Sequence, residues 1–225
     1  MTVVPDHVSR FAAMPSTMPT VFIVDDDISV REALEALIGS EGFAVKAFDS
    51  AQMFLAHTRD AVPSCLVLDV NLPGLNGLEL QEQISADRAA VPIIFITGYG
   101  DVPMTVKAMK AGASEFLTKP FNDEVLLDAI RGAIERSRAT IEHEAELGEI
   151  RARYATLSPR ELEVMGLVVL GLMNKQVGGK LDISEITVKA HRGRVMEKMK
   201  ARSLADLVRM AAALGLPTGS ASPQR

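Results

Sequence analysis

The chain has one cysteine, few histidines and no long apolar run, three features that would otherwise point to a disulfide, a metal site or a membrane span. Its 225 residues include one cysteine, Cys65, so it cannot form an internal disulfide. Cys65 stands in an apolar run, which favours a small buried hydrophobe over a reactive thiol. The histidines lack the spacing of a metal-binding set; they are His7, His57, His143 and His191. No apolar run approaches the roughly 20 residues that span a bilayer.

The two ends of the chain show no pattern of a packed domain. Residues 1–19 contain Pro, Ser, Thr and Met, but no basic start followed by an apolar block. We interpret them as a flexible leader and not as a signal peptide, so a cytoplasmic location is expected. Residues 217–225 are short of apolar side chains and are predicted to be disordered.

Charge is distributed unevenly along the chain. Residues 155–225 contain 11 Lys and Arg against 6 Asp and Glu, a net charge of +5. The whole chain carries −5, so residues 1–154 carry −10. The length suits one large domain or two small ones, and the asymmetry favours an acidic domain joined to a basic one. The basic part is a candidate for nucleic-acid contact, and a few solvated charged faces are the alternative.

Short apolar runs in the acidic part predict a parallel sheet. They do not alternate with polar residues, as expected when helices cover both faces of a sheet. The runs lie near residues 20–25, 44–48, 64–69, 92–97 and 115–118. Helical patterns follow at residues 29–40, 78–85, 102–111 and 123–138. This order predicts an α/β fold, a doubly wound (βα)5 domain.

Four of these strands end in residues that suit phosphoryl chemistry. TVFIVDDD ends in three aspartates, SCLVLD in Asp69, VPIIFIT in Thr97 and SEFLTKP in Lys119 and Pro120. The carboxyl ends of parallel strands meet at one edge of the sheet, where ligands bind. That edge would therefore hold two or three carboxylates, a hydroxyl group and an ammonium group.

Asp69 is the candidate nucleophile at this edge, because a carboxylate can attack phosphorus and become an acyl phosphate. A cluster of aspartates repels a phosphoryl group, and Mg²⁺, which prefers oxygen ligands, would offset that repulsion. Asp26 and Asp69 are expected to bind the ion directly and Asp25 through a water. The backbone carbonyl of Asn71 would complete the metal site.

Two further residues have expected roles toward the phosphoryl oxygens. Lys119 would supply a counter-charge, and Thr97 would donate a hydrogen bond. An aspartate after any one strand is more often a turn residue than a ligand. We interpret Asp27 and Asp101 in that way.

The basic part reads as an all-α domain. Ser158 to Glu161 form a capping box with proline at the first helical position. A short helix from Asn174 to Leu181 and a tight turn precede a third helix that Ser184 caps and that runs to about Lys200. Ser203 opens a fourth helix. A helix, a short turn and a cationic second helix form the outline of a helix-turn-helix. Residues 139–154 are charged and predict a helical linker.

The third helix carries the expected DNA contacts. One side is apolar and predicts core packing, with His191 interpreted as a partly buried core residue. The other side combines cations, which anchor phosphates or read guanine, with small residues that allow close approach to base edges. These candidates are Thr187, Lys189, Ala190, Arg192, Gly193 and Arg194. A solvated cationic helix face is the alternative.

The motifs VDDD, LVLDVNLPGLNG, FITGYGD and FLTKPF resemble the receiver domain of two-component response regulators, over about residues 19–138. The resemblance implies that a sensor histidine kinase phosphorylates Asp69. It also implies a cis bond between Lys119 and Pro120. The implied roles are Asp25 and Asp26 as acidic pair, Asn71 as carbonyl ligand, Thr97 and Phe116 as switch pair, and Lys119 as conserved-type lysine. Phe116 replaces the tyrosine of many receivers, which excludes a phenol hydroxyl.

The segments LSPRELEV and SEITVKAHRGRVMEKM resemble the LuxR/NarL-type helix-turn-helix, over about residues 155–216. With the run ITGYGDVPM, the chain resembles the FixJ branch of response regulators. This implies a transcriptional activator that dimerises through residues of about 100–130 when phosphorylated, binds promoter DNA of roughly two-fold symmetry, and has RNA polymerase as a partner. Gly178 and Gly179 depart from the family, which usually has alanines there. The expected domains are a leader 1–19, a receiver 20–138, a linker 139–154, a DNA-binding domain 155–216 and a tail 217–225.

Two other functions stay open from the sequence. The pattern Asp25-x-Asp27 weakly resembles the nucleophile motif of haloacid-dehalogenase-type phosphatases, which would make Asp25 the phosphorylated residue but leaves residues 155–225 unexplained. The other possibility is a phosphorylation-independent DNA binder whose receiver serves only for dimerisation. The favoured interpretation is not an enzyme, apart from a receiver that accepts a phosphoryl group and catalyses its own dephosphorylation.

Overall fold

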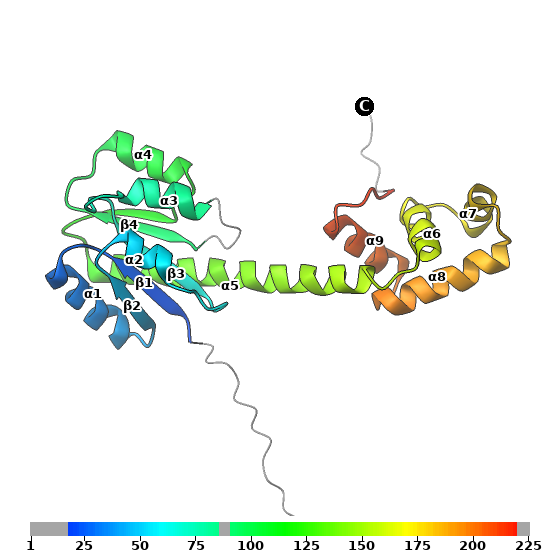
Figure 1. Cartoon of the computed structure of the whole chain (residues 1–225), viewed down its shortest axis with the longest axis horizontal. Helices are drawn as coiled ribbons and strands as arrows, with labels where there is room; N and C mark the ends of the chain where they lie inside the picture. Colours follow the sequence, from blue (N-terminus) through cyan, green and yellow to red (C-terminus); the bar gives the residue numbers. More distant parts are fainter. Residues whose placement is uncertain (1–17, 86–90, 220–225) are drawn as a thin grey trace, which may run out of the picture. The chain divides into compact units, whose positions relative to one another are not determined.

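A computed structural model describes residues 18–85 and 91–219 (Figure 1). The chain divides into an N-terminal unit, Met1–Ile141, and a C-terminal unit, Glu142–Arg225. The first elements in order are β1 (Thr20–Val24), α1 (Ile28–Ser40), β2 (Ala44–Phe48), α2 (Ala51–Ala56), β3 (Ser64–Asp69), α3 (Gly77–Ser85), β4 (Ile93–Thr97), α4 (Val102–Lys110) and β5 (Glu115–Thr118). They are followed by α5 (Asp123–Tyr154), α6 (Pro159–Val169), α7 (Asn174–Leu181), α8 (Glu185–Met199) and α9 (Leu204–Ala213).

The N-terminal unit is built on one parallel sheet with the strand order β2-β1-β3-β4-β5. This confirms the predicted doubly wound fold, with strand bounds within a residue of those expected. The short helix α2 is an addition, since no helical pattern had been assigned between β2 and β3. The order reverses between β1 and β3, so a crevice for ligands is expected beyond the carboxyl ends of these two strands.

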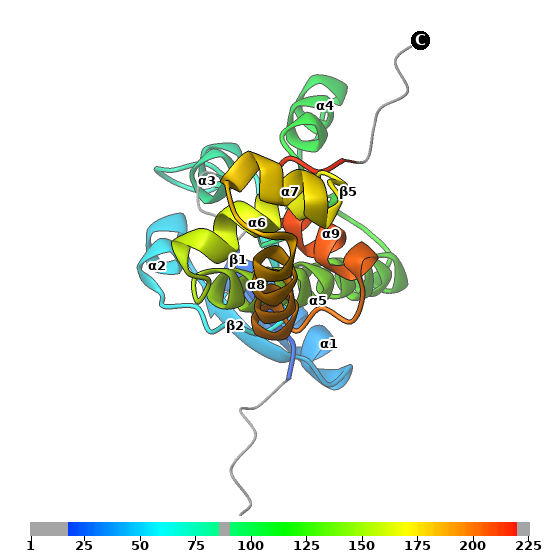
Figure 2. The same cartoon turned by 90° about the vertical axis from the view of Figure 1, so that its right-hand side faces the viewer.

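Helices cover both faces of the sheet, as the unalternating apolar strands predicted (Figures 1 and 2). Phe22, Leu66 and Phe95 point to the layer of α2, α3 and α4, whereas the intervening residues point to α1 and α5. Cys65 lies fully buried in the second layer, and burial raises the pKa of its thiol to about 12. The interpretation of Cys65 as a buried hydrophobe is confirmed.

Two aspartates near the carboxyl edge begin helices. The Asp27 side chain accepts a hydrogen bond from the Ser29 amide and caps α1. The Asp101 side chain accepts from the Met104 amide and caps α4. Both therefore have the local structural roles assigned to them, because a side-chain oxygen at this position satisfies an amide of the first turn.

The C-terminal unit is all-helical, as predicted, and α6 to α9 share one apolar core; Figure 2 shows α8 end-on among the other three. Val188, Val195 and Met199 are the buried residues of α8. The turn between α7 and α8 is tight because Asp182 adopts a left-handed conformation with φ of 54°. These contacts fix α8 against α6 and α7 and leave its opposite side exposed.

A partly buried ion pair joins the start of α6 to the end of α8. The Glu161 carboxylate accepts hydrogen bonds from the Lys198 ammonium at 2.6 Å and from the Ser158 amide at 2.8 Å. Lys198 also donates to the Thr156 carbonyl at 3.1 Å. The bond from Lys198, then that from Ser158, lowers the pKa of Glu161 to about 2. The predicted capping box is present and is also part of the tertiary structure.

The charged segment 139–154 continues α5 without a break. Such a polar helix needs packing to be stable. Ile150 and Tyr154 supply it, since both join the apolar core of the C-terminal unit.

The first residues of the predicted tail, 217–219, belong to the described residues. The Gly219 amide donates to the Val169 carbonyl at 2.9 Å, so this residue is bonded to the end of α6. A composition poor in apolar residues does not reveal such a backbone bond. Residues 220–225 and most of the predicted leader lie outside the described residues.

Candidate functional site

Three aspartates converge at the carboxyl edge of the sheet. Asp25 and Asp26 follow β1, and Asp69 is the last residue of β3. The two strands are neighbours, with Val24 paired opposite Leu68, so the aspartates that follow these two residues lie side by side. Each of the three offers a carboxylate oxygen within 4.8 Å of the other two. Asp26 is exposed, whereas Asp25 and Asp69 are buried, so the cluster opens to solvent on one side.

Lys119 joins two of these carboxylates. Its Nζ lies 2.7 Å from Oδ2 of Asp25 and 3.3 Å from Oδ2 of Asp69. Burial raises the pKa of Asp25, although the hydrogen bond from Lys119 opposes this. Burial lowers the pKa of Lys119, but the bond to Asp25 and the negative charges of Asp25 and Asp69 outweigh it and raise the pKa. Lys119 therefore remains an ammonium group directed into the acidic cluster.

The Lys119–Pro120 peptide bond, which follows β5, is cis as the resemblance implied. The lysine and the aspartates reach one another because β1, β3 and β5 end at the same edge of a parallel sheet.

Thr97 and Asn71 lie beside the cluster. Oγ1 of Thr97 is 3.3 Å from Nδ2 of Asn71 and accepts the Tyr99 amide at 3.2 Å. The backbone amide of Asn71 donates to Oδ1 of Asp69 at 3.2 Å. Phe116 is half-buried, with its ring 6.0 Å from the Phe95 ring. The structure thus places the predicted receiver residues at the carboxyl edge of the sheet. Phe116 lies within β5, the strand next to β4, which Thr97 ends.

Sequence reasoning gave no role to three residues that shape this pocket. A Cβ atom on Gly77 would lie 2.5 Å from the Asp69 carbonyl oxygen, so only glycine fits there. A Cβ on Gly100 would lie 3.0 Å from the Phe116 ring. Arg31 donates to the Asp25 carbonyl at 2.6 Å. The glycines stand inside the motifs LVLDVNLPGLNG and FITGYGD, which was the available signal.

The donor set suits a hard divalent cation. Mg²⁺ is bound through one or two carboxylates, keeps several waters and prefers oxygen ligands. The oxygens of Asp25, Asp26 and Asp69 meet that requirement, and among the described residues no histidine or cysteine joins them.

The predicted DNA-binding residues on α8 fall into two groups. Lys189, Ala190, Gly193 and Arg194 are exposed. The other two are half-buried and bonded within the protein: Thr187 pairs with the Ser184 hydroxyl at 2.8 Å and Arg192 with Oδ1 of Asn174 at 3.2 Å.

His191 lies on the opposite side of α8. It is half-buried, and its Nδ1 is buried without a hydrogen-bond partner among the described residues. This agrees with its interpretation as a partly buried core residue.

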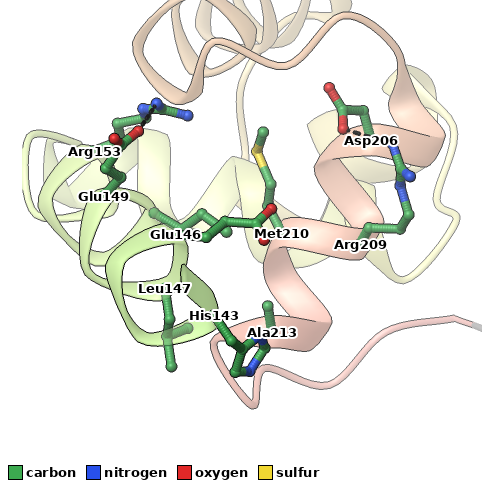
Figure 3. A pocket seen from close by; sticks show the side chains of 10 residues that line it. His143, Glu146, Leu147, Glu149, Arg153, Asp206, Arg209, Met210 and Ala213 are labelled. Atoms are coloured by element: carbon green, nitrogen blue, oxygen red, sulfur yellow. Dashed lines mark hydrogen bonds and ion pairs between the residues drawn. The ribbon is translucent and has the colours of Figure 1, made fainter. Parts of the chain in front are cut away.

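A separate cavity of about 220 Å³ lies between the end of α5 and α9 (Figure 3). Two ion pairs line it, Glu149 with Arg153 at 2.6 Å and Asp206 with Arg209 at 2.9 Å. These four charges therefore already have partners within the protein. The cavity contains no residue of the acidic cluster or of α8, and we assign it no chemistry.

Known proteins share both parts of this chain. Residues 21–131 match the family "Response regulator receiver domain", and residues 155–211 match "Bacterial regulatory proteins, luxR family". The chain is 54% identical over 201 residues to Nodulation protein W of Bradyrhizobium diazoefficiens, covering 89% of this chain and 88% of the relative. It is 48% identical over 196 residues to the transcriptional regulatory protein FixJ of Rhizobium meliloti, covering 87% and 96%.

Solved structures of response regulators have the same fold over most of this chain. The response regulator StyR has a TM-score of 0.78 at 49% identity, with 87% of this chain and 98% of that chain covered. Described helices long and apolar enough to cross a membrane are absent. The chain belongs to the response regulators of the FixJ branch, with a receiver domain and a LuxR-type DNA-binding domain.

Proposed function

We propose that Asp69 accepts a phosphoryl group from a partner sensor histidine kinase and that this controls transcription activation by the DNA-binding domain. The observation that carries the proposal is the convergence of Asp25, Asp26 and Asp69 on the ammonium group of Lys119. An oxygen of Asp69 attacks phosphorus, the bond from phosphorus to the kinase histidine breaks, and the imidazole leaves. Hydrolysis of the resulting acyl phosphate in the same pocket is the one reaction that we assign to the receiver.

The cofactor in this proposal is Mg²⁺, held by Asp25, Asp26, Asp69 and the carbonyl of Asn71. When bound, it supplies positive charge that offsets the repulsion between carboxylates and phosphoryl oxygens. The Lys119 ammonium group would bind a phosphoryl oxygen as a second counter-charge, because it already contacts Oδ2 of Asp69. The phosphatase alternative required Asp25 as nucleophile, but Asp25 is fully buried and paired with Lys119.

Thr97 and Phe116 would transmit the change. The Thr97 hydroxyl would leave Asn71 and donate to a phosphoryl oxygen, and the Phe116 ring would move into the space that Thr97 vacates. Gly100 lies in the loop between Thr97 and α4, and a Cβ atom on it would lie 3.3 Å from the Thr97 side chain and 3.0 Å from the Phe116 ring. A shift of Thr97 would therefore move the start of α4.

Receivers would then pair through the surface of residues 100–130. Support comes from apolar side chains exposed on and just before α4: Tyr99 at 86%, Val102 at 76%, Val106 at 44% and Met109 at 42%. Contiguous exposed apolar side chains commonly mark an interaction site. Pairing of receivers would join two weak half-site contacts into one bivalent contact with promoter DNA.

The DNA contacts in this proposal are those of α8. Lys189 and Arg194 are exposed cations, and Ala190 and Gly193 leave room for base edges. Thr187 and Arg192 would first have to exchange their partners within the protein. The dimer would act on RNA polymerase, in the cytoplasm.

Promoter affinity and oligomeric state test the proposal. With Mg²⁺ and a small-molecule phosphodonor, the wild-type protein should dimerise and bind a selected DNA site more tightly. Asp69→Asn should remain at the untreated level in both measurements. If treated and untreated wild-type protein behave alike, the phosphorylation-independent alternative replaces the proposal. Lys189→Ala tests the DNA face separately and should weaken binding in every state.

A further inference from the structure

Ile186, in the first turn of α8, is 82% exposed. Of the other large apolar residues of this helix, Val188, Val195 and Met199 are buried at 1% exposure or less, and Met196 is half-buried against the same core. The apolar core of the C-terminal unit is therefore complete without Ile186. A single exposed apolar residue needs no explanation by itself. The exposure of Ile186 is instead explained by its position on α8.

Ile186 lies on the same helix face as the proposed DNA contacts. Side chains at i, i+3, i+4 and i+7 line one face of an α-helix. Starting at Ile186, this series gives Lys189, Ala190 and Gly193, and all four residues are exposed. The face thus combines one cation, two small residues and one branched apolar side chain at its N-terminal end.

The two neighbouring candidates for base contact are bonded within the protein. The Thr187 hydroxyl pairs with the hydroxyl of Ser184, whose oxygen also accepts the Thr187 amide and so caps the helix. Arg192 donates to Asn174 at the start of α7. In the first turn of α8, the side chains that remain exposed are those of Glu185 and Ile186. Glu185 is acidic and would be repelled by phosphates, which leaves Ile186 for contact with DNA.

The chemistry of the DNA major groove limits what this side chain can bind. Recognition helices direct their N-terminal residues at base edges. In the major groove the 5-methyl group of thymine is the apolar feature, and the other base edges present hydrogen-bond donors and acceptors. Isoleucine has no donor or acceptor in its side chain. We propose that Ile186 determines sequence specificity by packing on the 5-methyl group of a thymine in each half-site.

This inference rests on the proposed role of α8 in DNA contact, and a single experiment separates the two. A binding site is first selected from random duplex DNA with the full-length protein treated with Mg²⁺ and phosphodonor. Each thymine of the site is then replaced in turn by deoxyuridine, which lacks only the 5-methyl group. Affinities are measured for the wild-type protein, Ile186→Ala, Lys189→Ala and Met173→Ala. Met173, at 69% exposure before α7, is the control for loss of an exposed apolar side chain.

The wild-type protein should lose affinity at one thymine per half-site, by about four-fold for each contact, since burying one methyl-sized group is worth about 0.8 kcal/mol. Ile186→Ala should bind the thymine and deoxyuridine sites equally. Lys189→Ala and Met173→Ala should keep the wild-type ratio between the two sites, and Lys189→Ala should bind both more weakly.

Two results would overturn the inference. One is a wild-type protein for which no deoxyuridine replacement changes the affinity. The other is an Ile186→Ala variant that keeps the wild-type ratio between thymine and deoxyuridine sites. If Lys189→Ala also binds like the wild type, the proposed DNA face of α8 fails together with the inference. The wild-type measurement needs no substitution, so it does not depend on the stability of a variant.

Discussion

The adjacent glycines of α7 should respond in opposite ways to the same substitution. A Cβ atom on Gly178 would lie 2.7 Å from the carbonyl oxygen of Ile183, which belongs to the turn before α8. That turn is closed by a hydrogen bond from the Ile183 amide to the Gly178 carbonyl at 3.1 Å. A Cβ on Gly179 would meet no atom within 4 Å outside its own helix. The chain therefore supplies a matched pair of sites for one test.

The size of the effect follows from helix propensity and from this contact. Glycine in a helix interior costs about 1 kcal/mol relative to alanine. Gly179→Ala should therefore stabilise the C-terminal unit by up to about 1 kcal/mol, which for a domain of this size raises Tm by about 4–8 °C. Gly178→Ala gains the same propensity but must displace the backbone of the turn. We expect its unfolding free energy to fall below that of the wild type.

Intrinsic fluorescence can follow this unit alone. The chain has no tryptophan and two tyrosines, Tyr99 in the N-terminal unit and Tyr154 in the core of the C-terminal unit. In a Tyr99→Phe background, urea unfolding followed by tyrosine fluorescence reports the environment of Tyr154. The reasoning is refuted if Gly178→Ala stabilises this transition as much as Gly179→Ala does.

Three further predictions concern the rest of the molecule. The pKa of Glu161 is about 2 in the folded protein against an ordinary 4.5, so its carboxylate stabilises the fold above pH 4.5 and this contribution is lost as the pH falls toward 2. Acid unfolding of Glu161→Gln should therefore depend less on pH, and a curve parallel to the wild type would contradict this. Gly100→Ala should weaken phosphodonor-induced dimerisation in size-exclusion chromatography, because its Cβ meets the Phe116 ring at 3.0 Å, whereas Gly98→Ala, with open space, should not. If both variants elute as dimers to the same extent after phosphodonor treatment, the close contact between Gly100 and Phe116 does not matter for dimerisation. Cys65, buried with a thiol pKa of about 12, should react with a thiol reagent in urea and not in buffer; labelling of the native protein would be the contrary result.

The sheet and its edge were predictable because they depend on local sequence patterns. Apolar runs that do not alternate define buried parallel strands, and the rule that their carboxyl ends share an edge brings Asp25, Asp69 and Lys119 together without any knowledge of side-chain contacts. The helices of the C-terminal unit were predictable from caps, such as Ser158 and Ser184, which mark where each helix starts.

Contacts between distant backbones and between flexible side chains were not predictable in this way. The helical wheel places Arg192 toward the DNA side, but it cannot reveal a bond to Asn174, 18 residues away. The close approach of Gly77 to the Asp69 carbonyl depends on the path of a loop. The bond from Gly219 to Val169 depends on where the chain returns after α9. Each of these needs three-dimensional coordinates.

The position of the phosphoryl group tests the central claim most directly. After phosphodonor treatment with Mg²⁺, borohydride reduces an aspartyl phosphate to a stable alcohol that mass spectrometry can locate. Asp25 and Asp69 lie on different tryptic peptides, residues 11–31 and 60–88, so the two sites are separable. The account predicts the modification at Asp69 and its loss in Asp69→Asn. Modification at Asp25, or an unmodified peptide 60–88 in a protein that still responds to the phosphodonor, would contradict it.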